Sequence, residues 1–419
     1  MRLFADTRPL RYPDYRRLWT ANIVTVLGAQ MTVVAIPAQI FHITGSSGYV
    51  GLSGIFGLVP LIVFGLWGGS LADVIDRRKL LIASTLGLIL SSVALAVLAL
   101  VGTDNVWLLL SVFAVQQAFF GLNQPARGAL LPTIVPLSLL PAANSLNMTV
   151  ATLGAVAGPV IGGALIPVFG YQLLYCLDAL FLGTTLYAVL RLPSLEPEKQ
   201  PHTRSGLRGV VDGFRYLGTN VVVMVSLLVD VIAMVFGMPR ALFPQIATET
   251  FGGPPEGGLV FSLLFAALAA GSAIAGVFSG WVSRVERQGL AVIVAIIVWG
   301  GAMTLFGLSL EFAAGFWTLA LCTALFGLAL GGGADIISAA FRSTMLQEAA
   351  TDDMRGRMQG VFIVVVAGGP RIADVLHGAA AEVTSTTVAT AGGGLLVIVL
   401  VLACALAFPA FRRYRVNRG

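Results

Sequence analysis

The sequence predicts an all-α membrane protein with twelve transmembrane helices, arranged as two six-helix halves that repeat one another. Of its 419 residues, 57% are hydrophobic and 11% charged, and the mean hydropathy is +0.90. A soluble domain carries about 25% charged residues. Apolar runs that reach the ~20 residues needed to cross a bilayer recur along the whole chain. Two sequence landmarks also recur at one common spacing, which indicates the repeat.

This composition excludes a soluble enzyme, a nucleic-acid-binding protein and a disordered chain. The 25 basic and 20 acidic residues give a net charge of +5. The three cysteines, Cys176, Cys322 and Cys404, lie in apolar stretches and indicate no disulfide framework. The basic N-terminus has no small-residue cleavage site before a short apolar run, so we expect the first span to be retained.

Apolar runs bounded by charged or turn residues define the expected spans. They cover 18–43, 48–72, 79–101, 106–125, 143–168, 171–190, 220–245, 257–281, 289–310, 315–336, 357–380 and 387–410. Turn signals separate several of them, at Gly45–Ser47, Gly102–Asn105 and Gly252–Pro255. The longest polar stretch, 191–219, reads as a cytoplasmic linker. It leaves 1–190 as the N-terminal half and 220–419 as the C-terminal half.

The basic residues predict the orientation. With twelve spans, 23 of the 25 Lys and Arg residues fall in loops or termini on one side. The opposite loops carry only acids: Asp104, Glu249, Glu256, Glu311 and Glu382. Because cytoplasmic loops are rich in Lys and Arg, both termini are expected in the cytoplasm and the protein in the cell membrane.

Two landmarks repeat at an offset of 211 residues. Gly69 opens a glycine-containing, basic segment after span 2, and Gly280 opens another after span 8. Gly158-Pro159 in span 5 matches Gly369-Pro370 in span 11. One offset shared by two landmarks favours duplicated halves, as in the parallel repeats of one transporter class.

The segment from Gly69 to Lys79 resembles the signature loop of the major facilitator superfamily, although Asp76 replaces its usual glycine. Three further segments indicate one branch of this superfamily: Tyr12–Trp19, Asp76–Arg78 and Met354–Arg357. Together they resemble the branch that contains enterobactin exporters and macrolide efflux proteins. The resemblance covers nearly the whole chain and implies two rocking halves around a central site.

The resemblance implies that the signature loop forms a gate on the cytoplasmic side. Its members here are Gly69, Asp73, Asp76, Arg77 and Arg78. The glycine would allow close helix approach, and Asp73 would accept hydrogen bonds at a helix N-terminus. The alternative is a basic loop that only fixes orientation.

A second predicted feature is a stripe of small residues on span 5. Gly154, Gly158 and Gly162 lie at i, i+4 and i+8, and Pro159 should kink the same helix. The resemblance implies an interhelix hinge on which the halves rock; the alternative is tight packing. Span 4 carries Gln116 and Gln117 where related antiporters often carry a buried arginine.

Ionisable residues inside spans mark the predicted substrate and proton pathway, because a charge in hydrocarbon costs ~2.5–3.5 kcal/mol. Arg371, Asp374 and His377 share a helical arc of about 120° in span 11. They read as a substrate contact or proton relay, or alternatively as a structural Arg–Asp pair beside a hydrogen-bonded histidine. Asp230 lies midway along span 7, where an unpaired carboxylate would take up a proton.

Further polar residues add to this pathway. Asp178 lies in span 6, about a third of the way in from the outer side, and is expected to belong to the pathway or, alternatively, to be a gate or capping residue. Asp335 is expected to be a gate or capping residue near the inner end of span 10. Neutral cavity contacts are expected from Gln30 in span 1 and from Gln116 and Asn123 in span 4.

No nucleotide loop, Cys/His cluster or paired nucleophile and base occurs, so we expect no enzyme, no metal and no cofactor. The sequence predicts a proton-driven secondary active exporter of an amphipathic small molecule, siderophore or drug-like, that works by alternating access. Its expected partners are the substrate, protons and the lipid bilayer, not nucleic acid, and we expect a monomer. Export rather than import follows from the resemblance alone. The alternative is a lysophospholipid flippase on the same fold.

Overall fold

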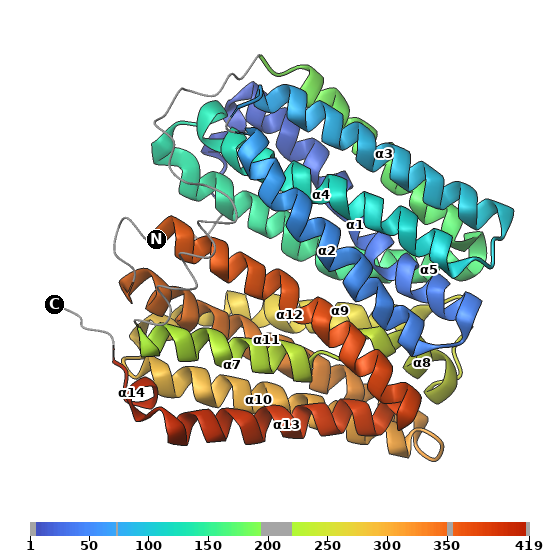
Figure 1. Cartoon of the computed structure of the whole chain (residues 1–419), viewed down its shortest axis with the longest axis vertical. Helices are drawn as coiled ribbons and strands as arrows, with labels where there is room; N and C mark the ends of the chain where they lie inside the picture. The colour runs from blue at the N-terminus through green and yellow to red at the C-terminus, as the bar shows by residue number, and fades with distance from the viewer. Residues whose placement is uncertain (1–5, 73, 194–219, 350–354, 416–419) are drawn as a thin grey trace. The chain divides into compact units, whose positions relative to one another are not determined.

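The computed structural model describes residues 6–72, 74–193, 220–349 and 355–415 (Figure 1). Side chains at 70, 72, 283, 347–349 and 355–367 are not described. The described chain is built from helices and short helical turns, and it contains no β-strand. This confirms the all-α membrane fold.

The helices of the first part of the chain are long and nearly continuous. They are η1 (Arg8–Arg11), α1 (Pro13–Thr44), α2 (Ser47–Ala72), α3 (Arg77–Val101), α4 (Val106–Ile134), η2 (Leu137–Leu139) and α5 (Leu140–Leu190). Side-chain caps begin two of them: Asp76 accepts from Arg78 N at α3, and Asn105 accepts from Trp107 N and Leu108 N at α4. These caps satisfy backbone N–H groups that a helix start leaves unpaired.

The later part is more interrupted. It comprises α7 (Val221–Gly237), η3 (Arg240–Leu242), α8 (Phe243–Gln245), the π-helical turn η4 (Ile246–Thr250), α9 (Leu259–Val277), η5 (Ser279–Arg284), α10 (Gln288–Ser309), η6 (Leu310–Phe312), α11 (Trp317–Ala349), α12 (Arg355–Val383), α13 (Thr386–Ala407) and α14 (Pro409–Arg412). Asn220 caps α7, and Ser385 caps α13.

Each predicted span coincides with helical structure. Ten described stretches are long and apolar enough to cross a membrane. One of them, Leu137–Leu190, has 54 residues and holds two predicted spans. These are separated at Gly170, whose φ of 72° and ψ of 177° break the helix in a conformation that favours glycine. The span expected at 357–380 lies in α12, whose side chains are described from residue 368 onward.

Two helices run past the predicted ends of their spans. The fourth span was expected to end at residue 125 and the tenth at 336, but α4 continues to Ile134 and α11 to Ala349. Arg127 and Arg342, counted above as loop residues, therefore lie inside helices. The fourth and tenth spans were predicted to end near a charged residue. A helix can continue through a charged residue when a polar partner or a cavity lies beside it.

The chain divides into two compact units in its described parts. Unit 1 comprises Met1–Ile43, Phe56–Gly206 and Glu256–Ser262, and unit 2 comprises Thr44–Ile55, Leu207–Pro255 and Leu263–Gly419. The two units pack their helices in the same pairs. In unit 1, α3 packs against α4 and α5; in unit 2, α10 packs against α11 and α13.

The matched glycines show the same repeat. A Cβ at Gly158 of α5 would meet Gln30 of α1, and a Cβ at Gly369 of α12 would meet Met234 of α7. In each unit the fifth span thus packs closely against the first. This agrees with two pseudo-repeated halves; the boundaries 1–190, 191–219 and 220–419 stay a prediction, and 194–219 lie outside the described residues.

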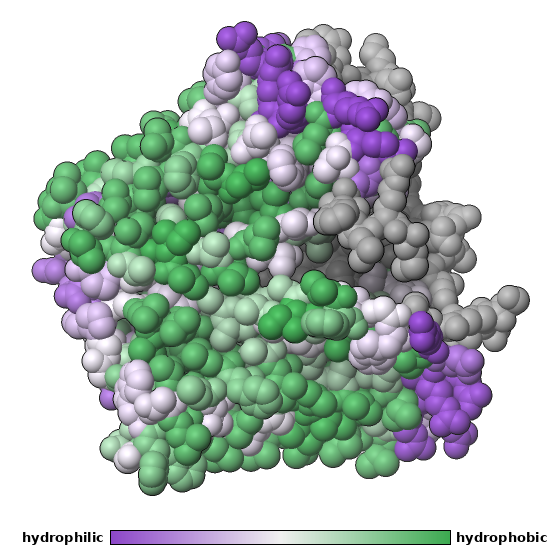
Figure 2. Space-filling model, turned by 180° about the vertical axis from the view of Figure 1, so that it is seen from behind, coloured by the Kyte–Doolittle hydropathy of each residue, from purple (hydrophilic) through white to green (hydrophobic). Residues whose placement is uncertain are grey.

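The outward faces of the helices are apolar. Leu90 and Leu180 in unit 1 are 68% and 64% exposed, and Leu319 and Leu406 in unit 2 are 63% and 73% exposed. Figure 2 shows one face of the molecule, on which hydrophobic residues cover most of the surface and hydrophilic residues gather in patches near its outline. Exposed apolar faces of this extent are suited to lipid rather than water.

Candidate functional site

A buried polar network in unit 1 centres on Asp178 of α5, which is 3% exposed. Ser92 of α3 donates a hydrogen bond of 2.7 Å to Asp178 Oδ2, and Gln116 of α4 donates one of 3.0 Å to Ser92. Gly28 of α1 covers the site, because a Cβ there would lie 3.0 Å from Asp178 Cα. None of the ion pairs among the described residues includes Asp178. The structure therefore places this carboxylate among neutral partners.

The other predicted amides of unit 1 lie in separate places. Asn123 donates to the hydroxyls of Ser84 and Thr85 on α3, at 2.9 and 3.3 Å. Gln30 of α1 packs over Gly158. Gln116 and Asn123 thus join α4 to α3, while Gln30 belongs to the contact between α1 and α5.

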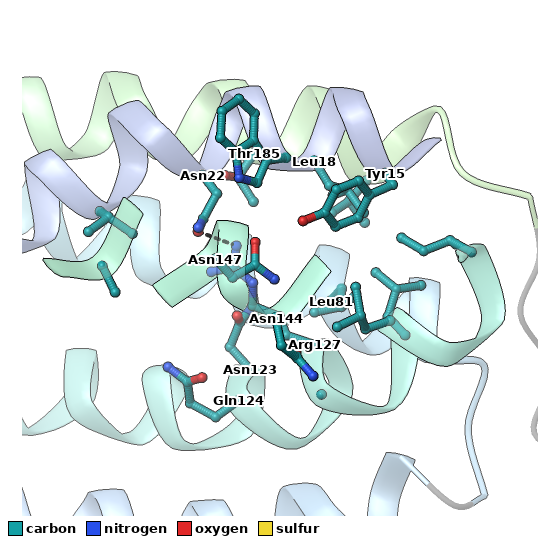
Figure 3. Close-up of a pocket in the computed structure, with 18 of the residues that line it drawn as sticks. Tyr15, Leu18, Asn22, Leu81, Asn123, Gln124, Arg127, Asn144, Asn147 and Thr185 are labelled. Carbon is teal, nitrogen blue, oxygen red and sulfur yellow. Dashed lines mark hydrogen bonds between the residues drawn. The ribbon is translucent and has the colours of Figure 1, made fainter. Parts of the chain in front are cut away.

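A cavity of about 540 Å³ lies within unit 1, between α1, α3, α4 and α5 (Figure 3). Its lining is Tyr15, Leu18, Trp19, Asn22, Val26, Leu81, Asn123, Gln124, Arg127, Gly128, Leu130, Leu131, Ile134, Asn144, Asn147, Met148, Ala151, Thr185 and Val189. Arg127 Nη2 donates a hydrogen bond of 2.7 Å to Asn22 Oδ1, drawn as a dashed line in Figure 3. The volume lies in the range of small-molecule sites, ~300–1,000 Å³.

The premise that Asp230 lacks a base is wrong. Asp230 of α7 is fully buried, and its Oδ1 lies 2.8 Å from Nη1 of Arg342 on α11, which is itself 2% exposed. Arg342 also donates to Ser338 at 3.1 Å and lies 3.8 Å from Asp335, whose side chain is 30% exposed. Asp335 is therefore an ion-pair partner inside α11 rather than a residue at a helix end.

The predicted cluster on α12, formed by Arg371, Asp374 and His377, does not share one set of neighbours. Asp374 has two basic electrostatic neighbours, Arg371 and Arg240 of η3. The first turns of α2 pack closely against this part of α12, because a Cβ at Gly54 would meet the carbonyl oxygen of Arg371. His377, 4% exposed, instead packs against α13, where a Cβ at Gly393 would lie 2.8 Å from its Cε1. Arg371 and Asp374 are thus brought together with Arg240, and His377 lies in a helix contact.

The residues of the signature loop make contacts inside unit 1. Asp76 caps α3, Arg77 Nη1 donates to the carbonyl of Ala129 at 3.2 Å, and Arg78 Nη2 donates to that of Leu190 at 2.7 Å. These bonds tie α3 to α4 and to the end of α5. Asp73 lies outside the described residues.

The close approach expected at Gly69 is not observed, because an added Cβ there would meet no described atom within 4 Å. The latch between the halves therefore stays a prediction.

The glycine stripe of α5 packs against α1. A Cβ at Gly154 would lie 2.5 Å from Val26, one at Gly162 would lie 3.5 Å from Met31 Cα, and Pro159 is buried beside them. The small side chains thus permit a close contact within unit 1. The hinge role stays a prediction.

Two arginines of these sites, Arg127 and Arg342, are not among the predicted site residues, and neither are Trp19, Asn144 and Asn147 of the cavity lining. Arg342 follows Asp335 and Ser338 at i+7 and i+4, so one helix face carries all three if the helix is allowed to continue. Arg127 follows Asn123 at i+4 in the same way. Spacing was therefore a usable signal for both residues. Among the described residues there is no group of three or more His, Cys, Asp or Glu side chains that could hold a metal.

Comparison with known proteins assigns a class to this fold. Solved structures with the same architecture are transporters. They include a nucleoside transporter NupG mutant (TM-score 0.73, 12% identity, 95% of this chain and 99% of that one) and a bacterial homolog of the human lysosomal transporter Spinster (TM-score 0.68, 16% identity, 99% and 100%). At these identities the likeness concerns the fold alone.

Sequence comparison gives the family. The family described as transmembrane secretion effector matches residues 5–416. Enterobactin exporters EntS of Shigella boydii serotype 18 and Escherichia coli O1:K1 are each 30% identical over 376 residues, covering 89% of this chain and 86% of theirs. The chain belongs to the transmembrane secretion effector family of the major facilitator superfamily. It is a multi-pass secondary transporter of the inner membrane.

Proposed function

We propose that this protein exports an amphipathic small molecule of siderophore type from the cytoplasm by alternating access, and that the cavity of unit 1 is a substrate site. The observation that carries the proposal is this cavity, which combines amides and one arginine with apolar walls. Such a lining suits a molecule with polar groups on an apolar body. The similarity to enterobactin exporters over most of the chain supports export and a siderophore-like substrate.

The transport cycle is driven by protons in this proposal. Asp178 is the group that best supports proton uptake, because an ionised carboxylate without a basic partner is costly in a buried site and is relieved by a proton. Its hydrogen-bond neighbours, Ser92 and Gln116, are neutral, and Tyr175 is the titratable group one turn earlier on α5. Asp230 is less suited to this role because Arg342 neutralises it.

A second cluster, in unit 2, contains two of the other predicted pathway residues. Arg371 and Asp374, with Arg240, form a charged group in unit 2 that we assign to the substrate pathway. The bias of Lys and Arg toward one side of the predicted spans supports a cytoplasmic location of both termini, and the proposed working unit is a monomer in the bilayer.

Complementation tests the proposed function. The chain is expressed in cells that lack their own enterobactin exporter, and enterobactin is measured in the medium and inside the cells. Export restores the extracellular amount and lowers the intracellular one. An inserted protein that changes neither amount, for enterobactin or for other amphipathic siderophores, refutes the proposed substrate class.

A further inference from the structure

The cavity of unit 1 contains a positive charge without a matching negative one. Arg127 is the one charged residue in the described lining, and its described hydrogen bond goes to the neutral Asn22. None of the ion pairs among the described residues includes Arg127. A cation withdrawn from bulk water is stabilised when an anion pairs with it. The site is therefore electrostatically suited to a negatively charged ligand.

A second donor in the lining lacks a partner. The indole Nε1 of Trp19 is buried and makes no hydrogen bond to a described residue. An unpaired buried N–H is costly, and a bound acceptor would relieve that cost. Trp19 and Arg127 come from different helices, α1 and α4, yet both line the cavity. Arg127 thus supplies the charge of the lining, and Trp19 adds an unpaired buried donor beside it.

The remaining lining suits the rest of such a ligand. Asn144 and Asn147 of α5 supply amides, and Figure 3 shows them in the same space as Arg127. Leu18, Leu131 and Met148 supply apolar walls. A free inorganic anion would use the donors and leave these walls without contacts. The lining therefore fits an anionic group attached to an apolar body.

We propose that this cavity binds an amphipathic organic acid, with its carboxylate or other acidic oxygen group on Arg127. The guanidinium is suited to this task because it is permanently charged and donates to two acceptor oxygens at once. The inference rests on the proposed function and narrows its substrate class from amphipathic molecules to amphipathic anions.

Equilibrium binding in nanodiscs tests the site on the full-length protein without requiring transport. The probes are 1-naphthoate and its neutral counterpart 1-naphthamide, with lysophosphatidylglycerol and inorganic phosphate as lipid and free-anion alternatives. Calorimetry gives affinity, and quenching of Trp19 fluorescence reports the location, with Trp19→Phe as the signal control. The protein variants are Arg127→Gln, Arg127→Lys and, as a matched control, Arg191→Gln, which removes a positive charge at the end of α5 outside the cavity.

The expected result is that naphthoate binds and Arg127→Gln weakens it about 10- to 100-fold, which is about 1.4–2.8 kcal/mol. Naphthamide binding to Arg127→Gln stays at the wild-type level, which shows that the variant is folded. Arg127→Lys retains most of the affinity for naphthoate, and Arg191→Gln retains all of it.

Wild-type naphthoate affinity in Arg127→Gln overturns the inference. So does Arg127-dependent binding of lysophosphatidylglycerol or phosphate without binding of naphthoate. Failure of cells to export any siderophore would refute the proposed function while leaving an Arg127-dependent binding result intact.

Discussion

The ion pair between Asp230 and Arg342 makes a sharp prediction about stability. Asp230→Asn keeps the shape of the side chain but leaves a buried arginine without its nearest carboxylate, 2.8 Å away. Asp335, at 3.8 Å from Arg342, is then the one described carboxylate still paired with it. We therefore expect Asp230→Asn to destabilise the protein rather than only to uncouple transport from protons.

The distances set the order of the effects. At an effective dielectric constant of about 20, the gross Coulomb attraction of Arg342 is about 6 kcal/mol for Asp230 and about 4 kcal/mol for Asp335. Stranding one member of a buried pair costs roughly 3–5 kcal/mol. Because Asp335 still compensates in part, we expect about 3 kcal/mol for Asp230→Asn. For Asp335→Asn we expect about 1 kcal/mol, since its carboxylate is partly exposed and more screened.

A double-mutant cycle measures the pair. Thermal unfolding of the purified protein in one detergent is followed for Asp230→Asn, Arg342→Gln, the double variant and Asp335→Asn. Both single variants of the pair should unfold at the lowest temperatures, with Asp335→Asn above them. The double variant should recover toward wild type, because it leaves neither Asp230 nor Arg342 as an unpaired charge, and the carboxylate of Asp335 that loses its base is partly exposed.

The reasoning fails if Asp230→Asn unfolds at the wild-type temperature. If the same variant also binds substrate normally and has lost proton-driven transport, Asp230 is a coupling residue and not a structural partner of Arg342.

Three further predictions concern coupling, packing and topology. Asp178→Asn should keep wild-type substrate binding and exchange in proteoliposomes but lose acceleration by a pH gradient; unchanged acceleration would remove Asp178 from the proton pathway. Gly158→Val should lower the unfolding temperature because its Cβ would overlap Gln30. Gly183→Ala, in the segment of α5 after Gly170 and with open space at its Cβ, should be neutral or stabilising by about 0.5–1 kcal/mol; equal effects would contradict the α1–α5 contact. Single cysteines are introduced into a background without the three native ones. Cysteines at outside positions should be labelled in intact cells, and cysteines at cytoplasmic positions only after permeabilisation. Labelling at 200 in intact cells would contradict the topology. The outside positions are 104, 253 and 311, and the cytoplasmic ones are 200 and 285.

The spans could be predicted because hydrophobic length is a direct demand of the bilayer. Each apolar run from 18–43 to 387–410 coincides with helical structure, and the matched Gly158-Pro159 and Gly369-Pro370 pairs mark equivalent helix contacts. Helix ends were harder to predict. A charged residue has the same letter whether it faces water, lines a cavity or pairs inside a helix bundle.

Arg127 and Arg342 show why the candidate site was only partly predictable. Each was placed in a loop because a basic residue in a loop is the common case for membrane proteins. What separates them from loop residues is a tertiary partner: Asn22 on another helix for Arg127, and Asp230 on another helix for Arg342. The i, i+3 spacing predicted that Arg371 lies beside Asp374, but nothing in the spacing indicated that Arg240 of η3 is a second basic neighbour of Asp374. Contacts between distant helices are set by packing and are not written in local periodicity.

Transport in proteoliposomes with an imposed pH gradient tests the central claim most directly. The purified protein is reconstituted, enterobactin or another amphipathic siderophore is supplied outside, and uptake is followed with the lumen made acidic or alkaline. Proton-driven export predicts that uptake into the acidic lumen exceeds uptake without a gradient, and that a protonophore or the reversed gradient abolishes this excess. Equal uptake under both gradients, or no uptake of any amphipathic siderophore by correctly inserted protein, would contradict the account.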